Sequence, residues 1–195
     1  MAETGACPRD NPRAVRGGGS LRSMPTLVLD PPPAELQALI ERREKLGQDL
    51  FDEVWEGVLH MNPAPAGAHG QLEKQLTLIL APLAKRAALE STGQFNLGDG
   101  PDDFRVPDGG FHRDWQNRVY YATAALVLEI VSPGDESYAK LPFYAAHGVD
   151  EVLIVDPQEQ AVRWLSLAGS EYRPLERSAL IELGPGELAD QIDWP

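Results

Sequence analysis

The sequence AALVLEIV at residues 124–131 decides the fold. A run of this length with almost no polar residue is typical of a central strand that is covered on both faces of its sheet. A helical pattern follows from Asp135 to His147, and the apolar run EVLIV at residues 151–155 predicts a second buried strand. Strand, helix and strand in this order predict a βαβ crossover, which should be right-handed.

The other elements follow from shorter patterns on either side of this unit. Apolar residues at helical spacing predict two helices, Ala34–Leu46 and Ala68–Leu89. Alternating apolar residues predict hairpins and strands at residues 51–62, 91–100, 104–111 and 161–174, and a short strand followed by an acidic turn at 180–194. We therefore expect an α/β fold in which helices flank both faces of a mixed central β-sheet, with an N-terminal hairpin.

Composition limits the domain organisation and the class of protein. The 195 residues are 43% hydrophobic and 24% charged, which suits one ordinary globular domain. Residues 1–23 are rich in Gly, Pro, Arg and Ser, so they predict a disordered leader before a single domain at 24–195. The single Cys7 excludes an internal disulfide framework and a cysteine zinc cluster. No signal peptide or transmembrane run is visible, so we expect a cytoplasmic protein.

The net charge of −13 counts against one class of function. Proteins that coat nucleic acid nonspecifically present basic surfaces, because neutralising phosphate dominates their affinity. This chain is acidic overall, with a pI near 4.6. A nucleic-acid substrate would therefore have to be engaged at a local groove or through a bound metal ion.

Two carboxylates and a lysine suggest such a site. Asp108 follows the apolar pattern FRVP, Glu129 lies inside the run at 124–131, and Lys140 falls on the helix that comes next. Mg²⁺ prefers oxygen ligands, usually one or two carboxylates with waters and substrate phosphate. Such an ion would polarise a phosphoryl oxygen and make a bound water more acidic, while a lysine would offset the developing charge.

Each of these residues also has a plainer interpretation. Asp108 precedes two glycines and would serve as a turn aspartate. Glu129 in a buried strand is costly unless it is paired or bound to metal, and an ion pair with Lys140 would satisfy it. Lys140 alone would be a solvated helix lysine. The combination of all three favours a metal site.

An ordered set of short motifs spans roughly residues 45–168. These motifs are PD at 107–108, LEIVSP at 128–133, Lys140 with Tyr144, GVDE at 148–151, VDP at 155–157, and upstream EVWEG at 53–57, MNP at 61–63 and His69. The set resembles the family described as "putative restriction endonuclease" within the PD-(D/E)XK nuclease superfamily. The resemblance implies a central sheet with flanking helices and an Mg²⁺-dependent phosphodiesterase site, with Mn²⁺ as a substitute.

The resemblance assigns roles to particular residues. Asp108 would be the first acidic ligand and Glu129 the second. Val131 stands where the superfamily usually has its lysine, and Lys140 would replace that lysine from the following helix. Val131 would still offer its backbone carbonyl to the metal. Glu136 stands where relatives often carry an aspartate. This difference affects the groups around the metal ligands and not the pair Asp108 and Glu129.

Two further side chains, Glu53 and His69, have open assignments, and Tyr144 has a single assignment. Glu53 would be an additional metal or water ligand, or an exposed strand residue. His69 would lie at the mouth of the metal site or touch substrate, or would be a structural residue near a helix start. Tyr144 is expected to pack in the core with its hydroxyl satisfied.

The expected function is hydrolysis of DNA phosphodiester bonds by an Mg²⁺-activated water, with Asp108, Glu129 and Lys140 as the catalytic residues. A homodimer would suit this function, because two cuts on a duplex need two sites. The alternative is a catalytically inactive nuclease-fold module with a binding or regulatory role, which the acidic surface and displaced lysine favour. A hydrolase of another phosphoester is a third reading.

Overall fold

The computed structural model describes residues 33–132, 134 and 136–195, so the predicted leader at 1–23 lies outside the described residues. The helices are α1 (Ala34–Lys45), α2 (Gly67–Arg86), the 3₁₀ helix η1 (Ser137–Lys140), α3 (Leu141–Ala146) and α4 (Pro185–Ala189). The strands are β1 (Glu53–Trp55), β2 (Val58–His60), β3 (Glu90–Thr92), β4 (Asn96–Gly100), β5 (Asp103–Arg105), β6 (Gly109–His112), β7 (Tyr120–Tyr121), β8 (Leu126–Ile130), β9 (Glu151–Asp156), β10 (Ala161–Ala168) and β11 (Glu171–Pro174). Within the described part of the chain, no helix is both long and apolar enough to span a membrane.

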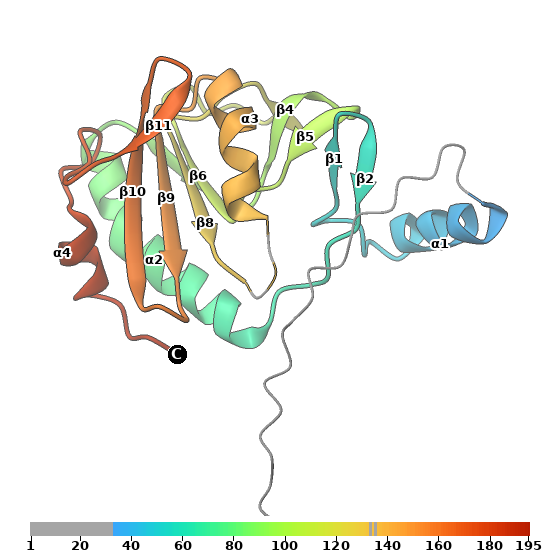
Figure 1. The fold of residues 1–195 in the computed structure, drawn as a ribbon, viewed down its shortest axis with the longest axis horizontal. Helices are drawn as coiled ribbons and strands as arrows, with labels where there is room; N and C mark the ends of the chain where they lie inside the picture. Colours follow the sequence, from blue (N-terminus) through green and yellow to red (C-terminus); the bar gives the residue numbers. More distant parts are fainter. Residues whose placement is uncertain (1–32, 133, 135) are drawn as a thin grey trace, which may run out of the picture.

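The strands form two sheets, as Figure 1 shows. The larger sheet has the order β11-β10-β9-β8-β6-β3, and the smaller has the order β2-β1-β5-β4-β7. In the larger sheet β8 and β9 run parallel, and η1 and α3 connect them, so the predicted crossover is confirmed. All other pairings in that sheet are antiparallel, which makes it mixed as expected.

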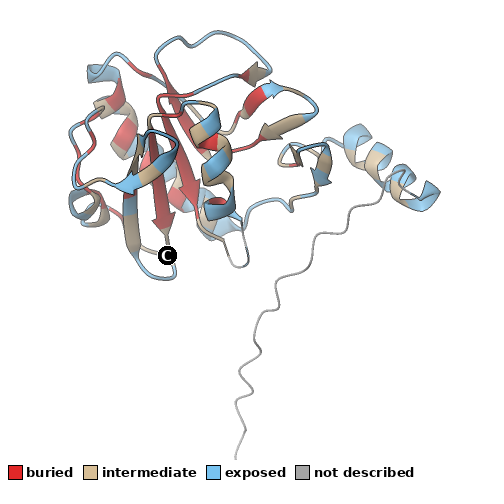
Figure 2. Ribbon diagram, turned by 45° about the horizontal axis from the view of Figure 1, so that its top comes forward, coloured by how far each residue is buried: buried red, intermediate tan, exposed pale blue. Residues whose placement is uncertain are grey.

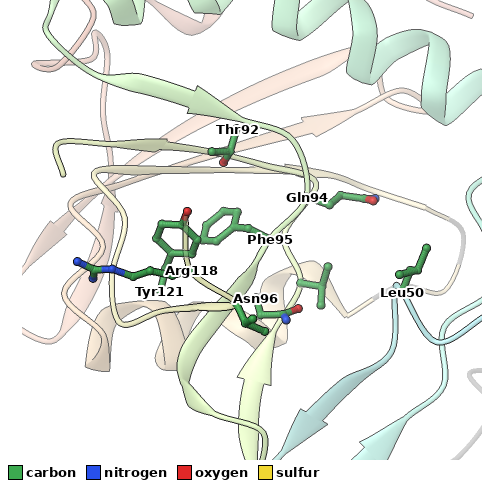
Figure 3. A pocket seen from close by; sticks show the side chains of 9 residues that line it. Leu50, Thr92, Gln94, Phe95, Asn96, Arg118 and Tyr121 are labelled. Atoms are coloured by element: carbon green, nitrogen blue, oxygen red, sulfur yellow. The ribbon is translucent and has the colours of Figure 1, made fainter. Parts of the chain in front are cut away.

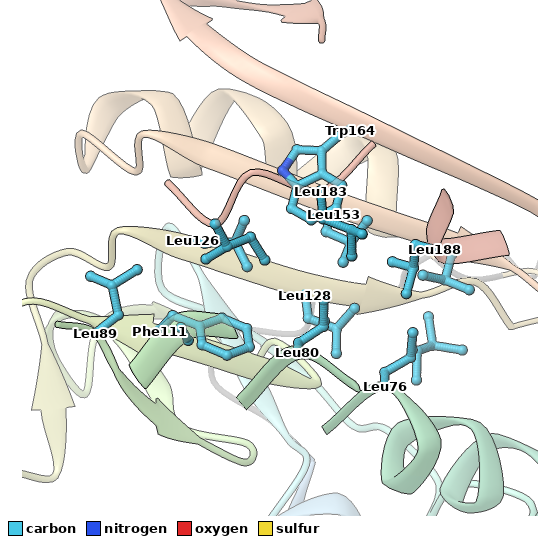
Figure 4. Packing of buried hydrophobic residues seen from close by; sticks show 14 of the residues in the cluster. Leu76, Leu80, Leu89, Phe111, Leu126, Leu128, Leu153, Trp164, Leu183 and Leu188 are labelled. Carbon is cyan, nitrogen blue, oxygen red and sulfur yellow. The ribbon is translucent and has the colours of Figure 1, made fainter. Parts of the chain in front are cut away.

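Helices cover both faces of the larger sheet. Side chains alternate along β8, so its apolar residues point to both faces and each face needs a covering layer. Leu126 and Leu128 pack with Leu76 and Leu80 of α2, on the face that α4 also covers (Figure 4). Val127 lies on the opposite face and packs with residues of β9 and with Tyr144 of α3. Buried residues accordingly concentrate in the central strands (Figure 2). A leucine buried in this way contributes about 2 kcal/mol to stability.

The N-terminal hairpin has the predicted position. β1 and β2 pair antiparallel around Glu56 and Gly57, whose φ angles of 50° and 84° match the left-handed turn that a tight hairpin requires. α1 has no buried residue and projects from the body of the molecule (Figure 1). A two-pronged ion pair attaches it, because Arg43 reaches both carboxylate oxygens of the buried Asp52 at 2.6 and 3.2 Å.

The predicted strand at 104–111 is wrong, because this stretch is divided between the two sheets. β5 pairs with β1 and β4 in the smaller sheet, whereas β6 pairs with β8 and β3 in the larger. Pro107 lacks the N–H that a continuing strand would need, so the chain changes sheet there. The predicted strand at 91–100 divides in the same way into β3 and β4. A single central sheet is therefore replaced by two.

Two other predicted elements differ in detail. The stretch 180–194 contains a helix, α4, rather than a strand, because Pro185 suits a first helical turn and the Glu187 carboxylate accepts the Gly184 N–H at 2.9 Å. The predicted helix ending at His147 is a 3₁₀ turn followed by the short α3. Gly148, at φ 64°, follows that helix as predicted.

A buried carboxylate on β9 gives the first prediction. Glu151 accepts hydrogen bonds from Trp164 Nε1 at 2.8 Å, Ser178 Oγ at 2.6 Å and the Ala179 N–H at 2.9 Å. Glu151→Gln replaces one acceptor oxygen with a donor, and should lower the free energy of unfolding by about 2 kcal/mol. Urea unfolding measures this, with the exposed Glu171→Gln as the matched control. Equal losses in the two variants would contradict the assigned network.

Candidate active site

Glu129 is a carboxylate in the middle of the molecule. It lies on β8 on the same face as Val127, toward α3, and is only 2% exposed. A buried carboxylate of this kind must be paired, hydrogen-bonded or neutralised. The residues that surround it therefore define the site.

Asp108 is fixed directly beside β8. Its Oδ2 accepts the main-chain N–H of Ile130 at 2.8 Å, and its Oδ1 lies 3.0 Å from His69 Nε2. Gly110, two residues after it, is required by packing, because a Cβ there would lie 2.3 Å from the Phe95 ring. The Asp-Gly-Gly sequence is therefore the entry to β6, and Asp108 is held next to Glu129's strand rather than in an exposed turn.

Lys140 lies between two buried carboxylates. Its Nζ is 2.8 Å from Glu53 Oε1 and 3.3 Å from Glu129 Oε1. Glu53, which is 1% exposed on β1, also accepts the Val106 N–H and Trp55 Nε1, each at 2.7 Å. Glu53 is therefore buried rather than exposed, and it anchors the lysine through contacts that no local pattern indicates. Its role as a metal or water ligand stays a prediction.

Tyr144 is the residue that the sequence assigns only to the core. Its side chain is fully buried, and its hydroxyl donates to Glu129 Oε1. It follows Lys140 by four residues, and a helical spacing of four places two side chains on the same face. The spacing from Lys140 is therefore the sequence feature that could have placed Tyr144 beside Glu129. Trp55 has a similar feature, because it lies two residues after Glu53 and so on the same strand face.

The electrostatics of the site show an excess of negative charge. Burial raises the pKa of Glu129 to about 8, the charge of Lys140 opposes this rise, and the nearby Asp108 and Glu53 add to it. Burial alone would lower the pKa of Lys140, but Glu129 and Glu53 raise it above its ordinary value. When all three carboxyl groups are ionised, Lys140 and a protonated His69 leave one negative charge unbalanced, and a bound divalent cation would stabilise this ionised state.

His69 and Glu136 have different contacts around this cluster. His69, in the first turn of α2, contacts Asp108 as described and Ser132 Oγ at 3.3 Å, and its hydrogen bond with Asp108 raises its pKa. Glu136 lies 3.2 Å from His60 Nδ1, and the His60 ring stacks on Trp55 with centroids 4.4 Å apart. The structure thus brings His69 to Asp108, whereas the Glu136 side chain contacts the N-terminal hairpin and its carbonyl accepts the Lys140 N–H at 3.2 Å.

The donor set fits a hard divalent cation. Asp108 and Glu129 provide two carboxylates. Mg²⁺ usually binds one or two protein carboxylates together with waters and substrate phosphate. Among the described residues, no group of three or more His, Cys, Asp and Glu is arranged as a metal site. Val131 follows β8, and its N–H donates to the Val155 carbonyl at 2.9 Å; its own carbonyl as a ligand stays a prediction.

The sequence also matches a family model. The model is that of Uma2, described as "Putative restriction endonuclease", and it covers residues 34–189. The chain belongs to this family. Membership places it among proteins described as nucleases, which act on nucleic acid, and confirms the resemblance found in the motifs. No curated protein matches the chain.

One solved structure supports the fold of this Uma2 chain. It is described as a "putative nuclease belonging to DUF820 from Anabaena variabilis" and is similar, with a TM-score of 0.59 and 17% identity over 72% of this chain and 90% of that one. The restriction-endonuclease-like fold is therefore confirmed. A DrdV–DNA complex gives a TM-score of 0.36 at 14% identity over 64% of this chain and 12% of that one, which carries no argument.

Proposed function

We propose that this Uma2 chain is an Mg²⁺-dependent endonuclease that hydrolyses DNA phosphodiester bonds. The observation that carries the proposal is the convergence of Asp108, Glu129 and Lys140 at one strand, β8. The family's description as a restriction endonuclease supports DNA as the substrate. Homodimer formation and a cytoplasmic location remain predictions from the sequence.

Asp108 and Glu129 would hold the cation, with Mn²⁺ as a substitute and the Val131 carbonyl as a further oxygen. When bound, the ion polarises a phosphoryl oxygen and makes its water acidic enough to act as a nucleophile. The Ile130 N–H donates to Asp108 and so fixes this carboxylate beside β8. Preorganisation of this kind avoids the cost of arranging the ligands when substrate arrives.

Lys140 supplies positive charge that does not depend on the ion. Glu53 holds the ammonium beside Glu129, so the lysine stays charged and in place. From that position it would stabilise negative charge that develops on the phosphate. Glu53 and Tyr144 then act as positioning residues, because each contacts Lys140 or Glu129.

The alternative is an inactive nuclease-fold module with a binding or regulatory role. One observation favours it, since Lys140 already satisfies Glu53 and Glu129 without an ion. A protein of this type would keep the buried network for stability alone. Binding of the cation separates the two functions.

Calorimetric titration with Mg²⁺ and Mn²⁺ tests the proposal, with cleavage of plasmid DNA as the second readout. Wild-type protein should bind one divalent ion, and Glu129→Gln should weaken that binding by at least about 100-fold, because a neutral amide replaces an anionic ligand. Glu90→Gln, at an exposed carboxylate of β3, is the control. Wild-type protein that binds neither ion with DNA present and leaves plasmid intact would instead support the inactive module.

A further inference from the structure

A cavity of about 340 Å³ lies next to the active site. Its lining comes from the start of the hairpin, the β3–β4 connection, the β5–β6 link and the segment that leads into β7 (Figure 3). The residues are Leu50, Thr92, Gln94, Phe95, Asn96, Val106, Arg118, Val119 and Tyr121. Val106 joins the cavity to the site, because its N–H donates to Glu53 and Asp108 follows it by two residues.

The charge of the lining is unusual for this protein. The chain has 30 acidic residues against 17 basic ones, yet none of the nine lining residues is acidic and one is an arginine. An anionic ligand would meet repulsion over much of the acidic surface and none from this lining. The cavity therefore suits a ligand that carries phosphate.

The polar groups of the cavity suit a nucleobase. Within the part of the chain that the structure describes, the side-chain amides of Gln94 and Asn96 make no hydrogen bond, and neither amide is closed off from solvent. Each amide offers donors and an acceptor, which match the mixed donor and acceptor edge of a base. They are available to a ligand rather than used by the fold.

The apolar groups supply the other half of a base site. Phe95 and Tyr121 pack edge to face, with ring centroids 5.5 Å apart, and form the inner wall. Leu50 and Val119 line the same cavity and are 70% and 69% exposed, the highest values among the large hydrophobic side chains that the structure describes. In Figure 3 Leu50 and Arg118 lie at opposite ends of the cavity with the two rings between them. The planar face of a base would cover such apolar side chains.

We propose that this cavity binds an unpaired nucleobase of a DNA strand whose neighbouring phosphate lies at Asp108 and Glu129. The inference rests on the proposed function and deepens it, because it names single-stranded or locally unpaired DNA as the substrate class. Gln94 and Asn96 contact the base edge, and Arg118, which lies 3.5 Å from the exposed Asp114 carboxylate, exchanges that contact for a phosphate. A base inside an intact duplex is stacked and cannot enter unless it is flipped out at a free-energy cost.

The charge of the whole chain agrees with this substrate. Duplex DNA carries one negative charge per roughly 1.7 Å of its axis, a denser charge than that of a single strand. A protein of net charge −13 is repelled more strongly by the duplex. A flexible strand can place one phosphate and one base in the site and leave the rest away from the acidic surface.

Fluorescence anisotropy with a labelled single-stranded DNA oligonucleotide tests the inference on the full chain. Ca²⁺ replaces Mg²⁺ in the buffer, so a divalent ion stays between the carboxylates and the phosphate while the measurement does not depend on nuclease activity. Gln94→Ala and Asn96→Ala should each weaken binding by about 3- to 10-fold, the effect of losing a hydrogen bond. Gln158→Ala, an exposed glutamine after β9, should bind like wild type. The matching duplex should bind more weakly than the single strand.

Equal affinity in the wild type and both cavity variants, or tighter binding to the duplex, would overturn the inference. Urea unfolding of each variant checks the fold. Gln94 lies outside the strands, so Gln94→Ala still tests the inference if Asn96→Ala is unstable. Cleavage with Mg²⁺ separates the two proposals. Cavity-dependent binding without cleavage would defeat the proposed function alone, and cleavage that both cavity variants retain in full would defeat the cavity alone.

Discussion

Asp108→Asn should lower the rate of DNA cleavage by at least about 100-fold and leave the fold intact. The asparagine carbonyl can still accept the Ile130 N–H, so the contact that attaches residue 108 to β8 survives. The neutral amide, however, provides neither the charge nor the second oxygen that a divalent ion requires. Loss of a direct ligand should cost at least as much as loss of a residue that only orients one.

Single-turnover cleavage and Mn²⁺ calorimetry on the same preparation measure this effect. Asp99→Asn is the matched control, because Asp99 is an exposed aspartate on β4. The unfolding midpoint should be nearly the same in both variants and in the wild type. Full cleavage by Asp108→Asn would place the metal elsewhere and would remove the basis of the proposed function.

The parts of the fold that the sequence predicts are those with a strong local signal. The run at 124–131 has one interpretation, because so few polar residues leave no face for solvent, and it forms β8 between two helical layers. The hairpin turn at Glu56 and Gly57 is equally local. By contrast, Pro107 indicates a break within residues 104–111, but nothing there reveals which sheets β5 and β6 join. That choice depends on partners far away in the chain.

The site shows the same division. Asp108, Glu129 and Lys140 are found from residue type and order, because a carboxylate in an apolar strand demands an explanation. The contact between Glu53 and Lys140 joins the first hairpin to the crossover helix, and only the packed structure brings them together. Tyr144 has the spacing to be found, yet an aromatic residue on a buried helix is equally well explained by packing. The Tyr144 ring packs in the core while its hydroxyl donates to Glu129, so the sequence shows only the first of these two roles.

Lys140→Met should destabilise the metal-free protein by about 3–5 kcal/mol, the largest stability effect expected in this chain. The substitution keeps the length and apolar stem of the side chain but removes the ammonium between Glu53 and Glu129. Two buried carboxylates then lose their common cation, and removing one partner of a buried ion pair costs about this much. Lys74→Met, at an exposed lysine of α2, should change stability by less than about 0.5 kcal/mol.

The pH dependence identifies the cause. In the wild type the pKa of Glu129 is about 8 in the folded chain and near 4.5 when unfolded, so the folded state binds the extra proton between these values. Stability therefore falls as pH rises through this window. Without Lys140, which lowers the pKa of Glu129, the decline should extend to higher pH. Urea unfolding at pH 5 and pH 9 should show the larger loss at pH 9; a Lys140→Met variant as stable as wild type at pH 9 would mean that these carboxylates do not depend on the lysine.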